Sequence, residues 1–164
     1  MRKLFAASLL SLTAIAAPVS AYAQQSGLPG LPVKLGDEVQ SVKAALNTSI
    51  DPEPIERSPA LPAGAVDPNK GKSVLHLRTK GIWVFFSATG KAEIIRMDAP
   101  YSGSVKGIKI GDSSQKLTST LGQPIKKPWP VFVTMQAYQY VLDDSAYVNF
   151  SVNDDGVQYI FLTR

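Results

Sequence analysis

The chain of 164 residues contains no cysteine. This absence excludes disulfide bonds, thiolate metal sites and an anchor acylated on cysteine, so the protein must be stabilised by its hydrophobic core. The chain also contains a single histidine, His76. One imidazole cannot form a histidine-based metal cluster, and a catalytic triad would also need a positioned acid and a nucleophile beside it. We therefore predict that the protein has no metal and no cofactor.

The sequence has little excess of charge of either sign. Lys and Arg number 17 against 13 Asp and Glu, a formal balance of +4, and no basic run is longer than Lys126-Lys127. Two positive charges, Arg2 and Lys3, lie in a segment that we expect to be removed, which leaves +2. Binding of DNA or RNA needs a clustered basic face, so we predict no nucleic-acid partner.

No apolar run is long enough to span a bilayer. The longest is Leu4 to Ala17, about 14 residues, where about 20 are needed. Arg2 and Lys3 precede this run and Ala21-Tyr22-Ala23 follows it, which is typical of a secretory signal peptide. We predict that residues 1–23 are cleaved near Ala23 and that the mature protein is periplasmic or secreted, with no stable membrane span. The alternative is that the segment stays as an uncleaved anchor.

Two stretches of the chain repeat one pattern, "PVKLGDEVQSVKAAL" at 32–46 and "GIKIGDSSQKLTSTL" at 107–121. Each alternates apolar and polar residues like the end of a strand, and then reaches a Gly-Asp pair. Asp37 and Asp112 are suitable N-caps for helices that follow them. Each helix would carry an apolar pair spaced i, i+4, namely Val42 with Leu46 and Leu117 with Leu121.

The later parts of the two copies also match in pattern. "GIWVFFSATG" (81–90) aligns with "AYVNFSVNDDG" (146–156), and each reads as a strand that ends in a hairpin turn. Further strands are predicted at 73–79, 91–97, 137–143 and 157–164. The segment 51–72 is rich in Pro, Gly and charge and is predicted to be a long, extended loop.

These patterns predict an α+β fold. It would consist of two tandem helix-plus-antiparallel-meander units that share a sheet, with the helices on one face. The first unit would occupy residues 24–104, including the loop 51–72, and the second residues 105–164. Neither unit could bury a sufficient core alone, so the repeat would make the core large enough. The alternative is a chance similarity between two helix starts.

The motif "IKIGDSSQKLTSTLGQP" (108–124) resembles the repeated motif of the β-lactamase-inhibitor-protein-like superfamily, which includes the tandem-repeat inhibitor and the SmpA/OmlA lipoprotein of outer-membrane barrel assembly. The resemblance covers both units in outline. It implies helices on one face of an antiparallel sheet and a role in binding other proteins rather than in catalysis. Without cysteine, the chain has neither the disulfides of the inhibitor nor the acylated residue of the lipoprotein.

Strand alternation places one set of aromatic and polar side chains on the face of the sheet opposite the core. Trp, Tyr and Arg often carry the binding energy of protein interfaces, so we predict a partner-binding face there. Its predicted residues are Trp83, Phe85, His76, Arg78, Tyr147, Asn149 and, from the proline-flanked "KKPWPVF" segment, Trp129. The alternative is that Trp83 and Phe85 are buried by the loop 51–72 or by the other unit, and that Trp129 pins a loop onto the core.

Signatures of catalysis are missing from the sequence. The turn at 153–156 lacks the further spaced ligands of a calcium loop, and "YSGSVKG" (101–107) lacks the phosphate-loop and dinucleotide fingerprints. Carboxylates are available for a hydrolase at Glu53, Glu56, Glu93 and Asp98, but nothing marks any of them. We therefore predict a protein that is not an enzyme.

Three functions remain open on the sequence. The first is a periplasmic inhibitor or immunity-type protein that acts on another exported protein, such as a toxin or a cell-wall or antibiotic hydrolase. The second is an accessory of envelope structure or assembly that binds peptidoglycan or an outer-membrane partner. The third is a carboxylate-based hydrolase. The sequence does not indicate an oligomeric state.

Overall fold

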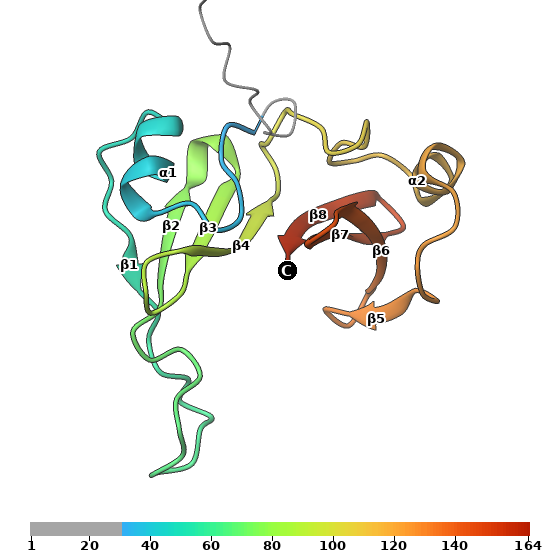
Figure 1. The fold of residues 1–164 in the computed structure, drawn as a ribbon. Helices are drawn as coiled ribbons and strands as arrows, with labels where there is room; N and C mark the ends of the chain where they lie inside the picture. The colour runs from blue at the N-terminus through green and yellow to red at the C-terminus, as the bar shows by residue number, and fades with distance from the viewer. Residues whose placement is uncertain (1–30) are drawn as a thin grey trace, which may run out of the picture.

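The computed structural model describes residues 31–164. The predicted signal peptide 1–23 lies outside the described residues, as does the beginning of the first predicted unit. Within them, eight strands form one antiparallel sheet in the order β1-β2-β3-β4-β8-β7-β6-β5 (Figure 1). Among the same residues, no helix is long and apolar enough to cross a membrane.

Most of the predicted strands are confirmed close to their expected bounds. The strands are β1 (Glu53–Pro54), β2 (Ser73–Leu77), β3 (Ile82–Phe86), β4 (Ala92–Met97), β5 (Trp129–Val131), β6 (Met135–Asp143), β7 (Ala146–Asn153) and β8 (Gly156–Thr163). The helices are α1 (Val39–Ala45), α2 (Ser114–Leu121) and a short 3-10 turn, η1 (Arg78–Lys80). The predicted strand ends at 33–35 and 108–110 are not strands.

The predicted fold class is wrong. The structure is mostly one eight-stranded antiparallel sheet, and it does not consist of two helix-plus-meander units with helices on a face. The α-helices have only 7 and 8 residues, about two turns each, and each buries a single residue, Val42 or Leu117. Helices this short cover little apolar surface, so the sheet supplies most of the core.

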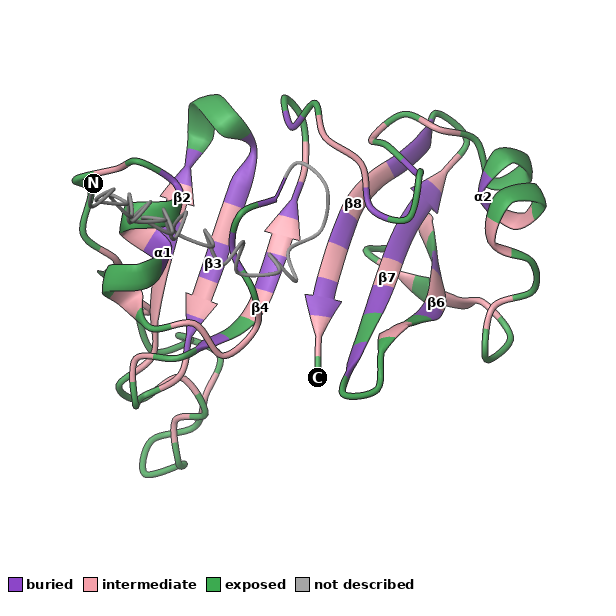
Figure 2. Cartoon of the chain, turned by 45° about the horizontal axis from the view of Figure 1, so that its top comes forward, coloured by how far each residue is buried: buried purple, intermediate pink, exposed green. Residues whose placement is uncertain are grey.

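The core follows the alternation of the strands. Along β3, Ile82, Val84 and Phe86 are buried, while the two residues between them are half-buried. The same alternation crosses the sheet as bands of buried and less buried residues on β3, β4, β8 and β7 (Figure 2). The apolar residues at every second position therefore form one continuous core, with a second, less buried set on the opposite side of each strand.

The repeated Gly-Asp pairs form matching turns rather than helix caps. The carboxylates of Asp37 and Asp112 accept hydrogen bonds from the backbone N–H groups of Lys34 and Lys109, each at 2.8 Å. Helix α1 begins after Glu38 without a side-chain cap, and the hydroxyl of Ser113 caps α2. The predicted caps are wrong because each carboxylate accepts its backbone hydrogen bond from the turn that precedes it, although Asp112 also accepts a bond from Nζ of Lys116 in α2.

These turns fasten the chain to the first residues of two strands. Gly36 donates to the carbonyl of Ala92 at 2.8 Å, and Ala92 donates to the carbonyl of Asp37 at 2.9 Å. Gly111, Asp112 and Val157 form the same pair of bonds at 2.8 Å each. The two similar sequence stretches thus make equivalent contacts with the starts of β4 and β8.

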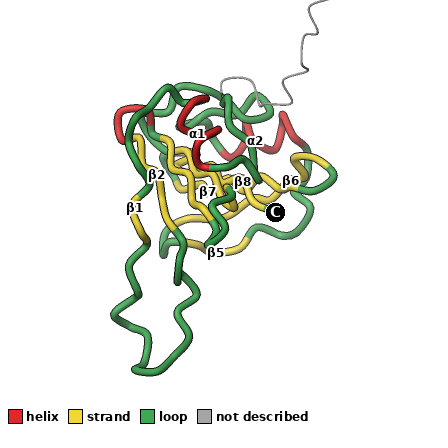
Figure 3. The backbone as a smooth tube through the Cα atoms, turned by 60° about the vertical axis from the view of Figure 1, so that its left-hand side comes forward, coloured by secondary structure: helices red, strands yellow, loops and turns green. Residues whose placement is uncertain are grey.

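The segment 51–72 forms β1 and then a loop that projects beyond the end of β1 and β2 (Figure 3). Val66 lies on it with 89% of its surface exposed. Turns inside the loop are closed by backbone bonds, including Leu61 to Ser58 and Ala65 to Pro62 at 3.1 Å each. The loop extends away from the sheet (Figure 1), so it does not form a lid over the strands.

Candidate functional site

The strand residues that alternate with the core define an outer face of the sheet. Strand pairing aligns five of its side chains in one row across five adjacent strands, in the order His76, Trp83, Arg96, Phe161 and Asn149. A second row includes Phe85, Ile94, Thr163 and Tyr147. Aromatic and β-branched neighbours of this kind stabilise a sheet through cross-strand contact.

Trp83 lies between two neighbours in the first row of this face. The ring of His76, on β2, is stacked on the indole at 17° from parallel, and the Cζ atom of Arg96, on β4, lies 4.2 Å from the indole centroid. The two contacts come from the strands on either side of β3, so they cover opposite faces of the ring. Trp83 therefore presents its edge, and not a free face, to a ligand.

Asp98 joins Trp83 to Arg96. Its Oδ2 atom accepts hydrogen bonds from Nε1 of Trp83 and from Nε of Arg96, each at 3.1 Å, and a further bond from Nη2 of Arg96 at 2.5 Å. Both partners of the ion pair are partly shielded from solvent, with side-chain exposures of 24% for Arg96 and 16% for Asp98. Charge-assisted bonds of this kind are stronger than neutral ones, so the three side chains form one rigid unit.

The aromatic cluster continues onto β8 and the β5–β6 turn. Arg96 also lies over the ring of Tyr159, 5.1 Å from its centroid. The ring of Phe132 lies 5.5 Å from Tyr159 and 6.3 Å from Phe161, measured between centroids. Phe132 is 59% exposed, so this part of the cluster is open to solvent.

One end of the aromatic cluster opens into a cavity of about 430 Å³. Its apolar walls include Ala99 and Ile110. The other lining residues are polar or aromatic, namely His76, Arg78, Trp83, Asp98, Gln158 and Tyr159. A hollow that gathers a few polar groups beside aromatic side chains is a candidate ligand site.

The electrostatics of this cavity are weakly positive. Burial lowers the pKa of His76 below its usual 6.5, and the nearby Arg78 guanidinium lowers it further, so the charged imidazolium is disfavoured. Asp98 carries a negative charge that Arg96 offsets through the ion pair. The Arg78 guanidinium forms no hydrogen bond or ion pair with another described residue, so its charge is uncompensated.

The structure brings four of the predicted site residues together. His76, Trp83 and Arg78 line the cavity, and Phe85 lies beside Trp83 with ring centroids 6.4 Å apart. Trp83 and Phe85 are half-buried, and the contacts that cover Trp83 come from its strand neighbours rather than from the loop 51–72.

The other three predicted residues lie farther along the sheet. Tyr147 and Asn149 are on β7, beyond β4 and β8, and Tyr147 is exposed. Trp129 is on the edge strand β5, half-buried, with Nζ of Lys126 5.0 Å from its ring. The outer face contains Tyr147 and Asn149 but does not place them next to Trp83.

Sequence reasoning missed three residues that hold this site together, Arg96, Tyr159 and Phe161. The signal was present in the returning strands "KAEIIRM" and "VQYIFLTR", where the same alternation places them on the outer face. Asp98 was singled out only as one unmarked carboxylate among several. Phe132 carried no signal, because its position depends on how the β5–β6 turn folds back over β8.

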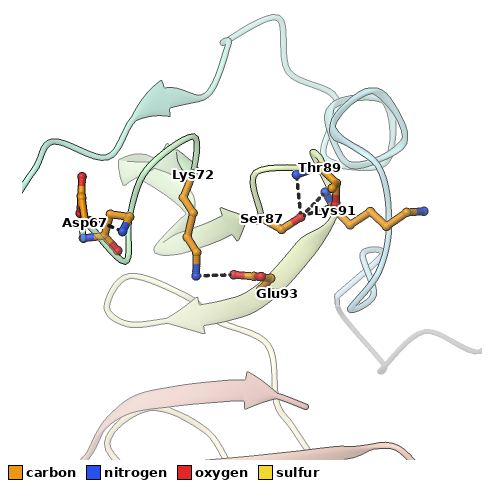
Figure 4. Close-up of polar contacts among 7 residues, drawn as sticks. Asp67, Lys72, Ser87, Thr89, Lys91 and Glu93 are labelled. Atoms are coloured by element: carbon orange, nitrogen blue, oxygen red, sulfur yellow. Dashed lines mark hydrogen bonds and ion pairs between the residues drawn. The ribbon is translucent and has the colours of Figure 1, made fainter. Parts of the chain in front are cut away.

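A second cavity, of about 650 Å³, lies near the start of β4 and the end of β8. Its lining includes Glu93, whose carboxylate is 3.0 Å from Nζ of Lys72, and the turn where the Ser87 hydroxyl contacts Thr89 and the N–H of Lys91 (Figure 4). Glu93 is the one acidic residue of this cavity and Asp98 the one of the first, so neither cavity pairs two carboxylates.

Residues 31–164 contain no cluster of three or more His, Cys, Asp or Glu side chains that could hold a metal ion.

Comparison with known proteins gives little support for an assignment. No family model matches the sequence, and no curated protein matches it. Among solved structures, the chain is similar to the crystal structure of a DUF4309 family protein, YjgB, from Bacillus subtilis, with 16% identity over 77% of this chain and 78% of that one and a TM-score of 0.45. A likeness at this level carries no functional argument, and the resemblance to the β-lactamase-inhibitor-protein-like superfamily stays a prediction.

Proposed function

We propose that the protein is an exported, non-catalytic binding module that acts on another exported or envelope protein through the outer face of its sheet. The inhibitor or immunity-type role is its most concrete form, with a toxin or a cell-wall or antibiotic hydrolase as the target. Export rests on the predicted signal peptide at 1–23.

The observation that supports this proposal is the composition and rigidity of the outer face. It gathers aromatic side chains and an arginine across adjacent strands, the residue types that carry most of the energy of protein interfaces. The bonds of Trp83 and Arg96 to Asp98 fix these side chains before a partner arrives. A face that is already ordered loses less conformational entropy on binding.

The test is affinity capture with the predicted mature protein, residues 24–164, as bait in a periplasmic extract of the source cells. A Phe85→Ala/Tyr147→Ala variant serves as the second bait, because these residues lie in one row of the outer face and make no side-chain bond in the Asp98 unit. Val66→Ala, on the projecting loop, is the matched control. Circular dichroism confirms that each variant is folded.

We expect the wild-type and Val66→Ala baits to capture one protein in stoichiometric amount, and the double variant to lose it. An inhibitor also requires that the captured enzyme or toxin loses activity when the bait is added. Capture of barrel-assembly proteins or peptidoglycan would instead assign the envelope accessory role. Hydrolysis of an envelope substrate by the protein alone would contradict the non-catalytic proposal.

A further inference from the structure

The cavity at the end of the aromatic cluster has a chemistry distinct from the face beside it. Its most exposed polar group is the Arg78 guanidinium, which forms no hydrogen bond or ion pair with another residue in 31–164. Arg78 is held at the rim by η1, where its carbonyl accepts a bond from the N–H of Gly81. The side chain is therefore anchored at its base while its charge stays available.

The remaining charge in the cavity is balanced internally. Asp98 bonds to Arg96 and Trp83 through one oxygen, so the single carboxylate of the lining is already partnered by a cation. Burial and the nearby Arg78 lower the pKa of His76, which disfavours a positive charge on the imidazole. The net charge offered to a ligand is thus that of Arg78.

The aromatic lining favours the same kind of ligand. Both faces of Trp83 are covered, one by His76 and one by Arg96, so the ring turns its edge toward a ligand. Aromatic rings are electropositive at the edge and electronegative at the face. One face of Tyr159 is likewise covered by Arg96. This arrangement disfavours a sugar, which would need a free ring face to stack on, and it favours an anionic group.

We propose that this cavity binds a carboxylate, with Arg78 as its ionic partner, and that the carboxylate belongs to an aspartate or glutamate side chain in an exposed loop of the protein that docks on the outer face. The proposal rests on the proposed function, because the cavity adjoins that face through Trp83. Guanidinium and carboxylate match in charge and in planar geometry, which makes arginine the preferred residue for such contacts. A volume of about 430 Å³ accommodates one side chain and adjacent backbone.

The test is an NMR titration of the isotopically labelled mature protein with an N-acetylated, C-amidated pentaglutamate peptide. The matching pentaglutamine peptide has nearly the same shape without the charge. We expect the indole N–H signal of Trp83 and the ring signals of His76 to shift saturably with pentaglutamate and not with pentaglutamine. Movement of signals outside the cavity alone would overturn the assignment.

Variants then identify which positive charge binds the pentaglutamate peptide. Arg78→Gln should weaken pentaglutamate binding at least about tenfold, and Arg78→Lys should bind more tightly than Arg78→Gln because it keeps the charge. Lys127→Gln removes an equal charge from an exposed position outside the cavity lining and should change affinity less than about twofold. Equal affinity for Arg78→Gln and the wild type would overturn the proposal.

Two further arms separate the possible failures. Sodium acetate at the same carboxylate concentration tests whether the cavity binds a free small carboxylate. If acetate binds as tightly as pentaglutamate, the assignment to a protein loop is overturned. In the capture experiment, a partner that is lost with Phe85→Ala/Tyr147→Ala but kept with Arg78→Gln would overturn this inference while the proposed function stands. Peptide binding that depends on Arg78, without any captured partner, would overturn the proposed function while this inference stands.

Discussion

The Arg96 guanidinium lies over the indole of Trp83, with its Cζ atom 4.2 Å from the ring centroid, and both side chains donate to the same oxygen of Asp98. The three residues lie on β3, β4 and the segment that follows β4. Their contacts combine a cation–π interaction with charge-assisted hydrogen bonds in a partly shielded position. The unit fixes the centre of the outer face, and several predictions depend on it.

Replacing Arg96 by Met should lower the free energy of unfolding by about 1–3 kcal/mol, because it leaves the half-buried Asp98 carboxylate with only the Trp83 donor. Urea denaturation followed by circular dichroism measures the loss. Asp154→Asn, at an exposed turn, is the control and should stay within about 0.5 kcal/mol of the wild type. A similar free energy for the two variants would mean that the Asp98 unit does not stabilise the fold.

Gly81 is required by the backbone beside the cavity. Its φ is +61°, and a Cβ atom there would lie 2.1 Å from the carbonyl oxygen of Asp98 and 2.6 Å from the nitrogen of Tyr101. Gly81→Ala should therefore destabilise the protein by more than about 2 kcal/mol, the upper cost of the left-handed conformation alone.

Gly64→Ala is the matched control for that substitution. Its φ is +81°, but no atom lies within 4 Å of the added Cβ. The free energy of unfolding should therefore fall only by the cost of the left-handed conformation, about 1–2 kcal/mol. Thermal and urea unfolding of the two variants under the same conditions make the comparison. Equal losses of stability in the two variants would show that the close contact of the added Cβ with Asp98 and Tyr101 relaxes without cost.

His76 should make stability depend on pH. Burial, followed by the charge of Arg78, lowers its pKa in the folded protein, while in the unfolded chain it titrates near 6.5. The unfolded chain then binds the proton more readily, so the stabilising contribution is complete above pH 6.5 and is lost as the pH falls through the folded-state pKa. An NMR titration of the His76 ring signals measures that pKa directly.

The same NMR titration in the Arg78→Gln variant isolates the contribution of the Arg78 charge to the pKa of His76. Removing the guanidinium should raise the pKa of His76 toward 6.5, while burial keeps it below that value. Urea midpoints at pH 7.5 and pH 5 should show a smaller drop for His76→Gln than for the wild type. A wild-type pKa above 6.5 would contradict both expectations.

The pairing of β4 with β8 should make the sheet unfold as one unit. Ile95 is fully buried and lies opposite Leu162 in this pairing. Ile95→Ala should lower the free energy of unfolding by about 2–5 kcal/mol. Single-tryptophan variants, Trp83→Phe and Trp129→Phe, then report from β5 and β3 respectively. Within each variant in the Ile95→Ala background, we expect tryptophan fluorescence and circular dichroism to give the same urea midpoint, and separate midpoints would mean that the sheet unfolds in parts.

Much of the sheet could be predicted from sequence because strand alternation is a local pattern. The alternation in "IWVFF" and "AYVNFSVN" correctly separated buried residues such as Val84 and Val148 from their neighbours. The fold class was wrong because the two stripes of Val42 and Leu117 support only two turns of helix each. How far an amphipathic pattern continues depends on tertiary packing that the local pattern does not contain.

The candidate site was predicted in part. Trp83, Phe85 and His76 were found because they alternate with core residues on two adjacent strands. Whether Trp83 offers a face or an edge could not be predicted, since it depends on how the side chains of His76 and Arg96 on the two neighbouring strands are oriented. The packing of Phe132 on Tyr159 joins residues from two hairpins and has no local signature.

The position of β8 has a consequence for how the chain acquires its structure. β8 is the last strand in the sequence, yet it lies between β4 and β7, near the middle of the sheet. Because the polypeptide is made with its N-terminus first, β1 to β4 have no partner on the β4 side until β8 has been made. The pairing of β4 with β8 is therefore completed only after β5 to β7 exist, and a chain without β8 would leave two exposed strand edges, on β4 and β7, instead of a shorter sheet.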